Sequence, residues 1–224
     1  MKKRRLLFLL MAMVLVLGSL SGCGGEGDTG GDDGDTGDAP DTIKIGINYE
    51  LTGEVATYGQ ACKDGIIMAF DEINAAGGVN GMELIPVVVD NKSDPAEATS
   101  LATKLITQEG VVACLGPATS GNFMATIPVG MQNGVPVVSA SATADEGVTT
   151  DSKGEVNEYV FRLCFTDSFQ GVTMASFAMD NLDATKAVII QDKSSDYAEG
   201  LAENFIETFE AAGGTIVAHE GYVS

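Results

Sequence analysis

The chain has 224 residues, with 12 Lys and Arg against 32 Asp and Glu, which gives a formal net charge of −20. A chain this acidic argues against binding to nucleic acid, which needs Lys and Arg to displace counterions, and against electrostatic docking on anionic lipid. His219 is the only histidine, so multi-histidine metal sites are excluded, and we expect neither a catalytic triad, nor a metal centre, nor a cofactor.

The first 22 residues have the layout of an export signal. Lys2 to Arg5 are all basic, and twelve apolar residues follow from Leu6 to Leu17. Twelve helical residues span about 18 Å, well short of the hydrocarbon core of a membrane at about 30 Å. Residues Leu20 to Cys23 resemble the bacterial lipobox, which predicts cleavage before Cys23 and a lipid on that cysteine. The alternative is an ordinary signal peptide with an incidental cysteine.

Residues 23–42 predict a disordered tether. After Cys23 this segment holds seven Gly and seven acidic residues, and it has no aromatic side chain. Such a composition cannot bury enough apolar surface to offset the entropy of ordering. An alternative is calcium binding by Asp32, Asp33, Asp35 and Asp38, but neither an EF-hand nor a glycine-rich nonapeptide repeat is present.

From residue 43 onward, strand and helix patterns alternate, which predicts an α/β fold with parallel sheets and helices on both faces. A polar stretch at 143–157 suggests two sheets, so we expect an N-terminal lobe at 43–160 and a partial C-terminal lobe at 161–224. Because the second lobe has only about two βα units, we expect it to be incomplete and the reading frame to be truncated. The expected strands are 43–48, 84–90, 111–115, 135–139, 159–165, 187–191 and 215–223, and the expected helices are 58–76, 95–108, 120–132, 168–181 and 197–212.

Three cysteines follow Cys23. We expect Cys62 on a helix and Cys114 and Cys164 on strands, where cysteine behaves as a small apolar residue. No pair is close in sequence, and an odd number outside the cytoplasm leaves at least one thiol free. We therefore expect a protein that is stabilised by a hydrophobic core and not by a framework of disulfides.

In an open parallel sheet, ligands bind at the carboxyl ends of the strands, often beside helix N-termini. The hydroxyls of Ser120 and Thr143 fall at such positions, next to backbone N–H groups at a helix start or a turn. This combination suits a small carboxylate. The alternative is that Ser and Thr only cap the helix and shape the turn.

A series of short segments across residues 43–224 resembles the extracytoplasmic solute-binding proteins of the leucine/isoleucine/valine type, which have the type I periplasmic-binding-protein fold. Each segment alone is weak, but their order and spacing together are specific. They are Ile45-Gly46, Leu51-Thr52-Gly53, Tyr58-Gly59, Asp71 to Gly81, Asp94-Pro95, Ala98, Gly116-Pro117, Gly134 to Ser139, Ser141-Ala142-Thr143, Phe161-Arg162, Asp167, Gln170-Gly171 and Asp196 to Gly200.

The resemblance implies two Rossmann-like βα lobes that close on a ligand between them. Ser120 and Thr143 would hold the α-carboxylate of an amino acid, and the carbonyl of Ser141 would receive its ammonium group. Ala142 lies between these loop positions, and Tyr58 and Tyr197 would be aromatic walls. The second-lobe acidic partner of the ammonium group in the family falls beyond residue 224. The first-lobe disulfide of the family has no counterpart, because Ser93 and Thr119 stand roughly where its cysteines would be.

By this resemblance the protein is the substrate-binding lipoprotein of an ABC importer. It would be anchored outside the cytoplasm through Cys23 and would deliver a small amino acid to the permease subunits. Relatives also bind amides, urea, short peptides and aromatic acids, and an extracytoplasmic ligand sensor of the same fold is the alternative. An enzyme is not expected, because the strand-end loops offer hydroxyls with no histidine or cysteine nearby.

Overall fold

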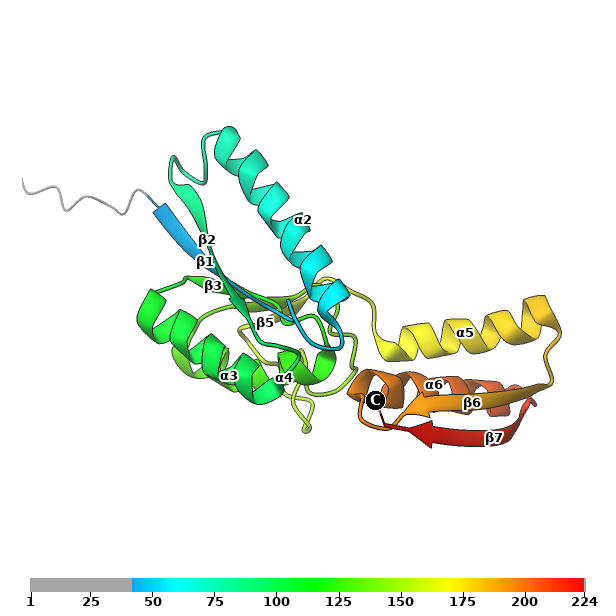
Figure 1. Ribbon diagram of the computed structural model, residues 1–224. Coiled ribbons are helices and arrows are strands. Elements are labelled where there is room, and N and C mark those ends of the chain that lie inside the picture. The colour runs from blue at the N-terminus through cyan, green and yellow to red at the C-terminus, as the bar shows by residue number, and fades with distance from the viewer. Residues whose placement is uncertain (1–41, 224) are drawn as a thin grey trace, which may run out of the picture. The chain divides into compact units, whose positions relative to one another are not determined.

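The computed structural model describes residues 42–223 (Figure 1). The predicted signal peptide, the lipid site at Cys23 and nearly all of the predicted tether therefore lie outside the described residues. A five-stranded parallel sheet in the order β2-β1-β3-β4-β5 forms the first part of the described chain. Its strands are β1 (Thr42–Tyr49), β2 (Glu83–Asp90), β3 (Ala113–Leu115), β4 (Val137–Ser139) and β5 (Val160–Arg162).

Helices cover both faces of this sheet, as the alternating pattern predicted. Helix α2 (Ala56–Ala75) lies on one face, and α3 (Pro95–Lys104) and α4 (Ser120–Asn133) lie on the other (Figure 1). The start of α3 is fixed by Asp94, whose side chain accepts a hydrogen bond of 2.7 Å from the backbone N–H of Glu97. Its last turn widens into a π-helix, η1 (Leu105–Glu109), which the sequence analysis did not predict.

The core of the first sheet lies under α3 and α4. Phe123 of α4, Leu105 of η1 and Val137 of β4 are fully buried in one cluster. Truncating a buried Phe to Ala costs about 3–5 kcal/mol, so Phe123 alone contributes a large part of a typical domain's stability. This packing holds the N-terminus of α4 at the carboxyl edge of the sheet.

The strand at 160–162 belongs to the first sheet, where it pairs in parallel with β4. The expectation that the second sheet begins near residue 160 is therefore wrong, and the expected lobe boundary at 160/161 cuts through β5. The reason is tertiary, because Val160 is buried in the same core as Val137. The short apolar pattern of β5 does not indicate which of the two sheets the strand joins.

A second, two-stranded parallel sheet follows, with its helices on one face only. It consists of β6 (Lys186–Asp192) and β7 (Thr215–Tyr222). Helix α6 (Asp196–Ala211) packs on this sheet, and α5 (Asp167–Leu182) packs on α6, as Figure 1 shows. The opposite face exposes apolar side chains, with Val188, Ile190 and Val217 each more than half exposed.

The cysteines beyond residue 42 are all free thiols in the structure. Cys62 lies in α2 and Cys114 in β3, as predicted. Cys164 lies two residues after the end of β5, so its predicted place in a strand is wrong. Among the helices of residues 42–223, none has the length and apolar character needed to cross a membrane.

Candidate functional site

The carboxyl edge of the first sheet brings the N-terminus of α4 against the loop that follows β4. Ser120, the first residue of α4, is only 2% exposed, and its Oγ accepts a hydrogen bond of 3.2 Å from the backbone N–H of Ala144. The two hydroxyl residues predicted for the site are thus brought together, because Thr143 directly precedes Ala144. The Ser120 hydroxyl therefore fixes the position of the loop at 141–144.

The loop at 141–144 is itself held by Ser139 at the end of β4. The Ser139 hydroxyl donates to the carbonyl of Pro117 at 2.7 Å and accepts from the N–H groups of Ser141 and Ala142 at 3.2 and 3.0 Å. The Ser141 hydroxyl donates to the carbonyl of Ala118 at 2.7 Å. Ser139 therefore fixes the backbone of the segment for which a ligand-binding role was predicted.

Glu50, which the sequence analysis did not assign to the site, is hydrogen-bonded to the residues at the start of α4. It follows β1 directly, is fully buried, and accepts four hydrogen bonds from the start of α4. The available signal was topological, since β1 neighbours β3, and so the residue after β1 must lie near the loop that leads into α4. Its donors are the N–H of Ala118 at 2.9 Å, the N–H and Oγ1 of Thr119 at 3.2 and 3.0 Å, and Nδ2 of Asn122 at 2.8 Å.

Tyr58 reaches this region through the start of α2. It is 66% exposed, and the next residue, Gly59, packs so closely on Glu50 that a Cβ at Gly59 would overlap the Glu50 backbone. Glycine is thus required at 59 to bring α2, and with it Tyr58, to the carboxyl edge of the sheet.

Tyr197 approaches from α6. The residue before it, Asp196, lies against Gly121 of α4, where an added Cβ would be 2.6 Å from Oδ2 of Asp196. The Tyr197 hydroxyl accepts a hydrogen bond of 2.9 Å from Nε2 of Gln170 on α5. The start of α6 thus lies against the first turn of α4, and Tyr197 remains partly exposed.

Asp167, the first residue of α5, is tied to Thr143. Its backbone N–H donates to the carbonyl of Thr143 at 2.9 Å, and its side chain is fully buried. Burial raises the pKa of the Asp167 carboxyl, and the Asp145 carboxylate adds to the rise, while the Thr143 hydroxyl and the Arg162 guanidinium oppose it. The Thr143 hydroxyl is near enough to favour the ionised carboxylate, although neither carboxyl oxygen of Asp167 meets full hydrogen-bonding geometry with it or with another donor.

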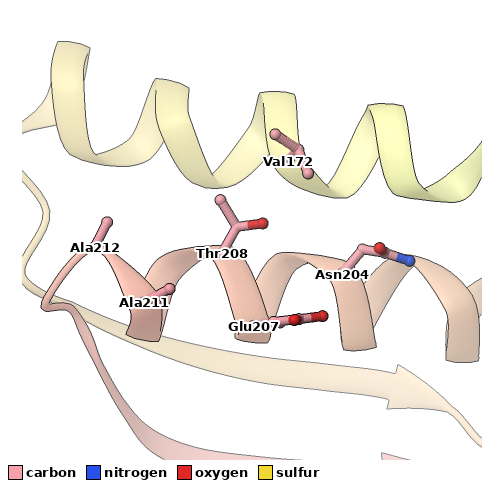
Figure 2. Close-up of a pocket in the computed structure, with 6 residues that line it drawn as sticks. All are labelled: Val172, Asn204, Glu207, Thr208, Ala211 and Ala212. Carbon is pink, nitrogen blue, oxygen red and sulfur yellow. The ribbon is translucent and has the colours of Figure 1, made fainter.

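A separate hollow of about 510 Å³ lies between α5 and α6. Figure 2 shows its lining side chains, which come from both helices and carry no predicted site residue. Among residues 42–223, no group of three or more His, Cys, Asp or Glu side chains is arranged to hold a metal ion. The hollow is lined by Val172, Asn204, Glu207, Thr208, Ala211 and Ala212.

Comparison with known proteins gives a consistent picture. A family model described as periplasmic binding protein matches residues 42–224. A Pseudomonas aeruginosa protein named as a leucine-, isoleucine-, valine-, threonine- and alanine-binding protein is 33% identical over 183 residues, which are 82% of this chain and 47% of that protein. The chain therefore spans about half the length of the curated relatives it matches.

Solved structures agree with the sequence relatives. The branched-chain amino-acid transporter substrate-binding protein LivJ of Streptococcus pneumoniae, solved with isoleucine, is 45% identical with a TM-score of 0.75, and the match covers 82% of this chain and 50% of that one. A solute-binding protein of an ABC transporter from R. palustris, solved with 4-hydroxybenzoate, is 29% identical with a TM-score of 0.70. That match covers 81% of this chain and 47% of that one.

Proposed function

Because this chain belongs to the periplasmic binding protein family, we propose that it captures a small amino acid of the leucine, isoleucine or valine type for an ABC importer. The ligand lies at the start of α4, between the lobe built on the first sheet, which ends with β5, and the lobe that begins with α5. Ser120 and Thr143 hold its carboxylate, the Ser141 carbonyl receives its ammonium group, and Tyr58 and Tyr197 flank its side chain. No step of covalent chemistry is involved.

The observation that carries this proposal is the contact between Ser120 and the loop at 141–144. The 3.2 Å hydrogen bond from the N–H of Ala144 to Ser120 Oγ holds the loop that carries Thr143 against the N-terminus of α4. Two hydroxyl side chains at a helix N-terminus suit a single small carboxylate. The relatives named for leucine, isoleucine and valine supply the ligand class.

The mechanism is closure of the two lobes on the ligand. A ligand that contacts both lobes binds the closed arrangement more tightly than the open one, so it shifts the population toward closure. The closed form then docks on the permease subunits of the importer.

Attachment to the membrane follows from the leader. Residues 1–22 are the signal peptide, Cys23 carries the lipid, and the residues between Cys23 and the start of β1 at Thr42 are the tether of a protein held outside the cytoplasm. The acidic composition leaves little electrostatic attraction to anionic lipid, so the anchor depends on the acyl chains. In cells, Cys23→Ala should move the protein from the membrane fraction to the soluble one, and mass spectrometry should find acyl groups on Cys23 of the parent. A Cys23→Ala protein that stays in the membrane fraction refutes the anchor.

A thermal-shift panel tests the ligand. Leucine at a hundredfold excess over its Kd adds about 2.7 kcal/mol to the free energy of unfolding. For a domain of this size, that corresponds to a rise in Tm of roughly 5–10 °C. The panel includes isoleucine, valine, short amides, urea and 4-hydroxybenzoate. A shift only with amides, urea or 4-hydroxybenzoate reassigns the ligand, and no shift with any compound refutes the binding function.

A further inference from the structure

Arg162 at the end of β5 reaches back to the loop that follows β4. In the parallel sheet it pairs with Ser139, the residue that leads into this loop. Nη1 of Arg162 donates to the carbonyls of Ala142 and Ala144, at 3.4 and 2.6 Å. One half-buried guanidinium therefore binds the carbonyls of both residues that flank Thr143.

The N–H of Thr143 is the donor that this arrangement leaves unused. The N–H groups of its neighbours Ser141, Ala142 and Ala144 all donate to serine hydroxyls. No acceptor within residues 42–223 is paired with the N–H of Thr143, although this residue is only 7% exposed. Because a buried N–H without a partner is costly, this group is suited to receive an acceptor from a bound molecule.

The contact between Arg162 and the Ala142 carbonyl determines where that N–H points. The peptide bond between Ala142 and Thr143 is trans, so its C=O and its N–H point in opposite directions. With the carbonyl directed at the guanidinium, the N–H is directed away from β5. Since β4 lies between β5 and β3, the direction away from β5 leads toward α4, which follows β3.

We infer that Arg162 is a positioning residue: by holding the carbonyls of Ala142 and Ala144, it turns the N–H of Thr143 toward the ligand's carboxylate at the start of α4. This inference rests on the proposed function and adds to it a residue that does not itself touch the ligand. Arginine suits this task because its planar guanidinium presents several donors in a fixed geometry and keeps its charge.

Balancing the charge of Asp167 is the purely structural role that the test must separate from positioning. The Arg162 guanidinium opposes the rise in the pKa of the Asp167 carboxyl that burial and the Asp145 carboxylate cause. If Arg162 served only to balance that charge, removing both charges together would leave ligand binding intact. Positioning predicts a loss in both cases, since removing the Asp167 charge does not restore a donor to the carbonyls of Ala142 and Ala144.

The test compares leucine with leucine amide, which carries a neutral amide in place of the carboxylate, by calorimetry on the full-length protein. The parent should prefer leucine. In Arg162→Met, and in the same variant combined with Asp167→Asn, the ratio of the two dissociation constants should fall at least tenfold, the scale of one charged hydrogen bond. In Lys153→Met, which removes a positive charge at an exposed position, the ratio should stay within about twofold of the parent.

The outcomes separate this inference from the proposed function. A general loss of stability weakens the binding of both compounds and leaves their ratio unchanged. If the double variant keeps the parent's ratio, the guanidinium only balances charge, so the positioning role is wrong and the binding function stands. If neither leucine nor any related amino acid binds the parent, the amino-acid function fails and this inference fails with it.

Nitrogen-15 NMR of the parent decides the question if the Arg162 variants do not fold. Leucine should move the amide proton of Thr143 downfield, because an N–H that donates to a carboxylate makes a strong, charge-assisted hydrogen bond. Leucine amide should move it far less. A Thr143 amide signal that leucine leaves unmoved overturns the inference, because the orientation that Arg162 imposes then serves no contact with the ligand.

Discussion

Glu50 offers the sharpest test of how the sheet edge is built. We expect Glu50→Gln to destabilise the protein, because the carboxylate accepts four hydrogen bonds in a fully buried position. With the amide oxygen at the Oε1 position, the new NH₂ group faces the N–H of Ala118, and two donors meet. With the amide reversed, the NH₂ group lies at the Oε1 position and faces three donors from Thr119 and Asn122, which destabilises the protein further.

The magnitude follows from these contacts. The variant loses one charged hydrogen bond of about 1.5–3 kcal/mol, and the three that remain become neutral and weaker. The loss of negative charge at the N-terminus of α4 adds about 0.3–1 kcal/mol. A total of about 2–4 kcal/mol corresponds to a fall in Tm of roughly 5–15 °C for a domain of this size.

Circular dichroism melts of the parent and the variant measure this fall. The matched control is Glu83→Gln, the same change at an exposed position that begins β2, where surface substitutions cost at most about 0.5 kcal/mol. If Glu50→Gln melts within about 2 °C of the parent, the four hydrogen bonds do not stabilise the start of α4, and our account of this edge is wrong.

Two further predictions concern binding and acid stability. Ser120→Ala and Thr143→Val should each weaken leucine binding by about 1–3 kcal/mol in calorimetry, whereas Ser100→Ala and Thr215→Val at exposed positions should not; unchanged affinity in both site variants moves the site elsewhere. Burial alone would raise the pKa of Asp90, but hydrogen bonds from Thr52, Lys92 and Leu51 outweigh it and lower the pKa. Its contribution to stability is therefore present above the unfolded-state pKa and is lost as the pH falls through the lowered one. In urea titrations, Asp90→Asn should cost about 1 kcal/mol at pH 7 and much less at pH 3, and an equal cost at both pH values contradicts this.

Much of the fold was predictable because the signals were local. Asp94 with Pro95 marks the start of α3, and the glycines after residue 76 mark the end of α2, so both boundaries agree with the structure to within a residue or two. The π-helical turn at Leu105–Glu109 was not predictable, since its five-residue hydrogen-bond spacing leaves no mark in an apolar periodicity. The same holds for β5, whose place in the first sheet depends on the burial of Val160.

The candidate site was predictable only in part. The hydroxyls of Ser120 and Thr143 could be assigned to strand ends, and the structure brings their backbones together through Ala144. Glu50 and Asp167 were missed as site residues, because an acid after a strand or at a helix start usually serves as an exposed cap. The carboxyl group of Glu50 is buried because β1 lies next to β3, and that of Asp167 is buried because Gly200 packs against it.

The acid beside Gly121 affects which solutes this edge can accept. The carboxyl group of Asp196 lies next to Gly121 and that of Glu50 is hydrogen-bonded to Ala118 and Thr119, so two acidic side chains already lie at the start of α4. An inorganic phosphate or a dicarboxylate such as glutamate would meet more repulsion there than a zwitterion, whose ammonium group offsets the charge of its carboxylate. We therefore expect selection against net anions before any fit of the solute's side chain is considered.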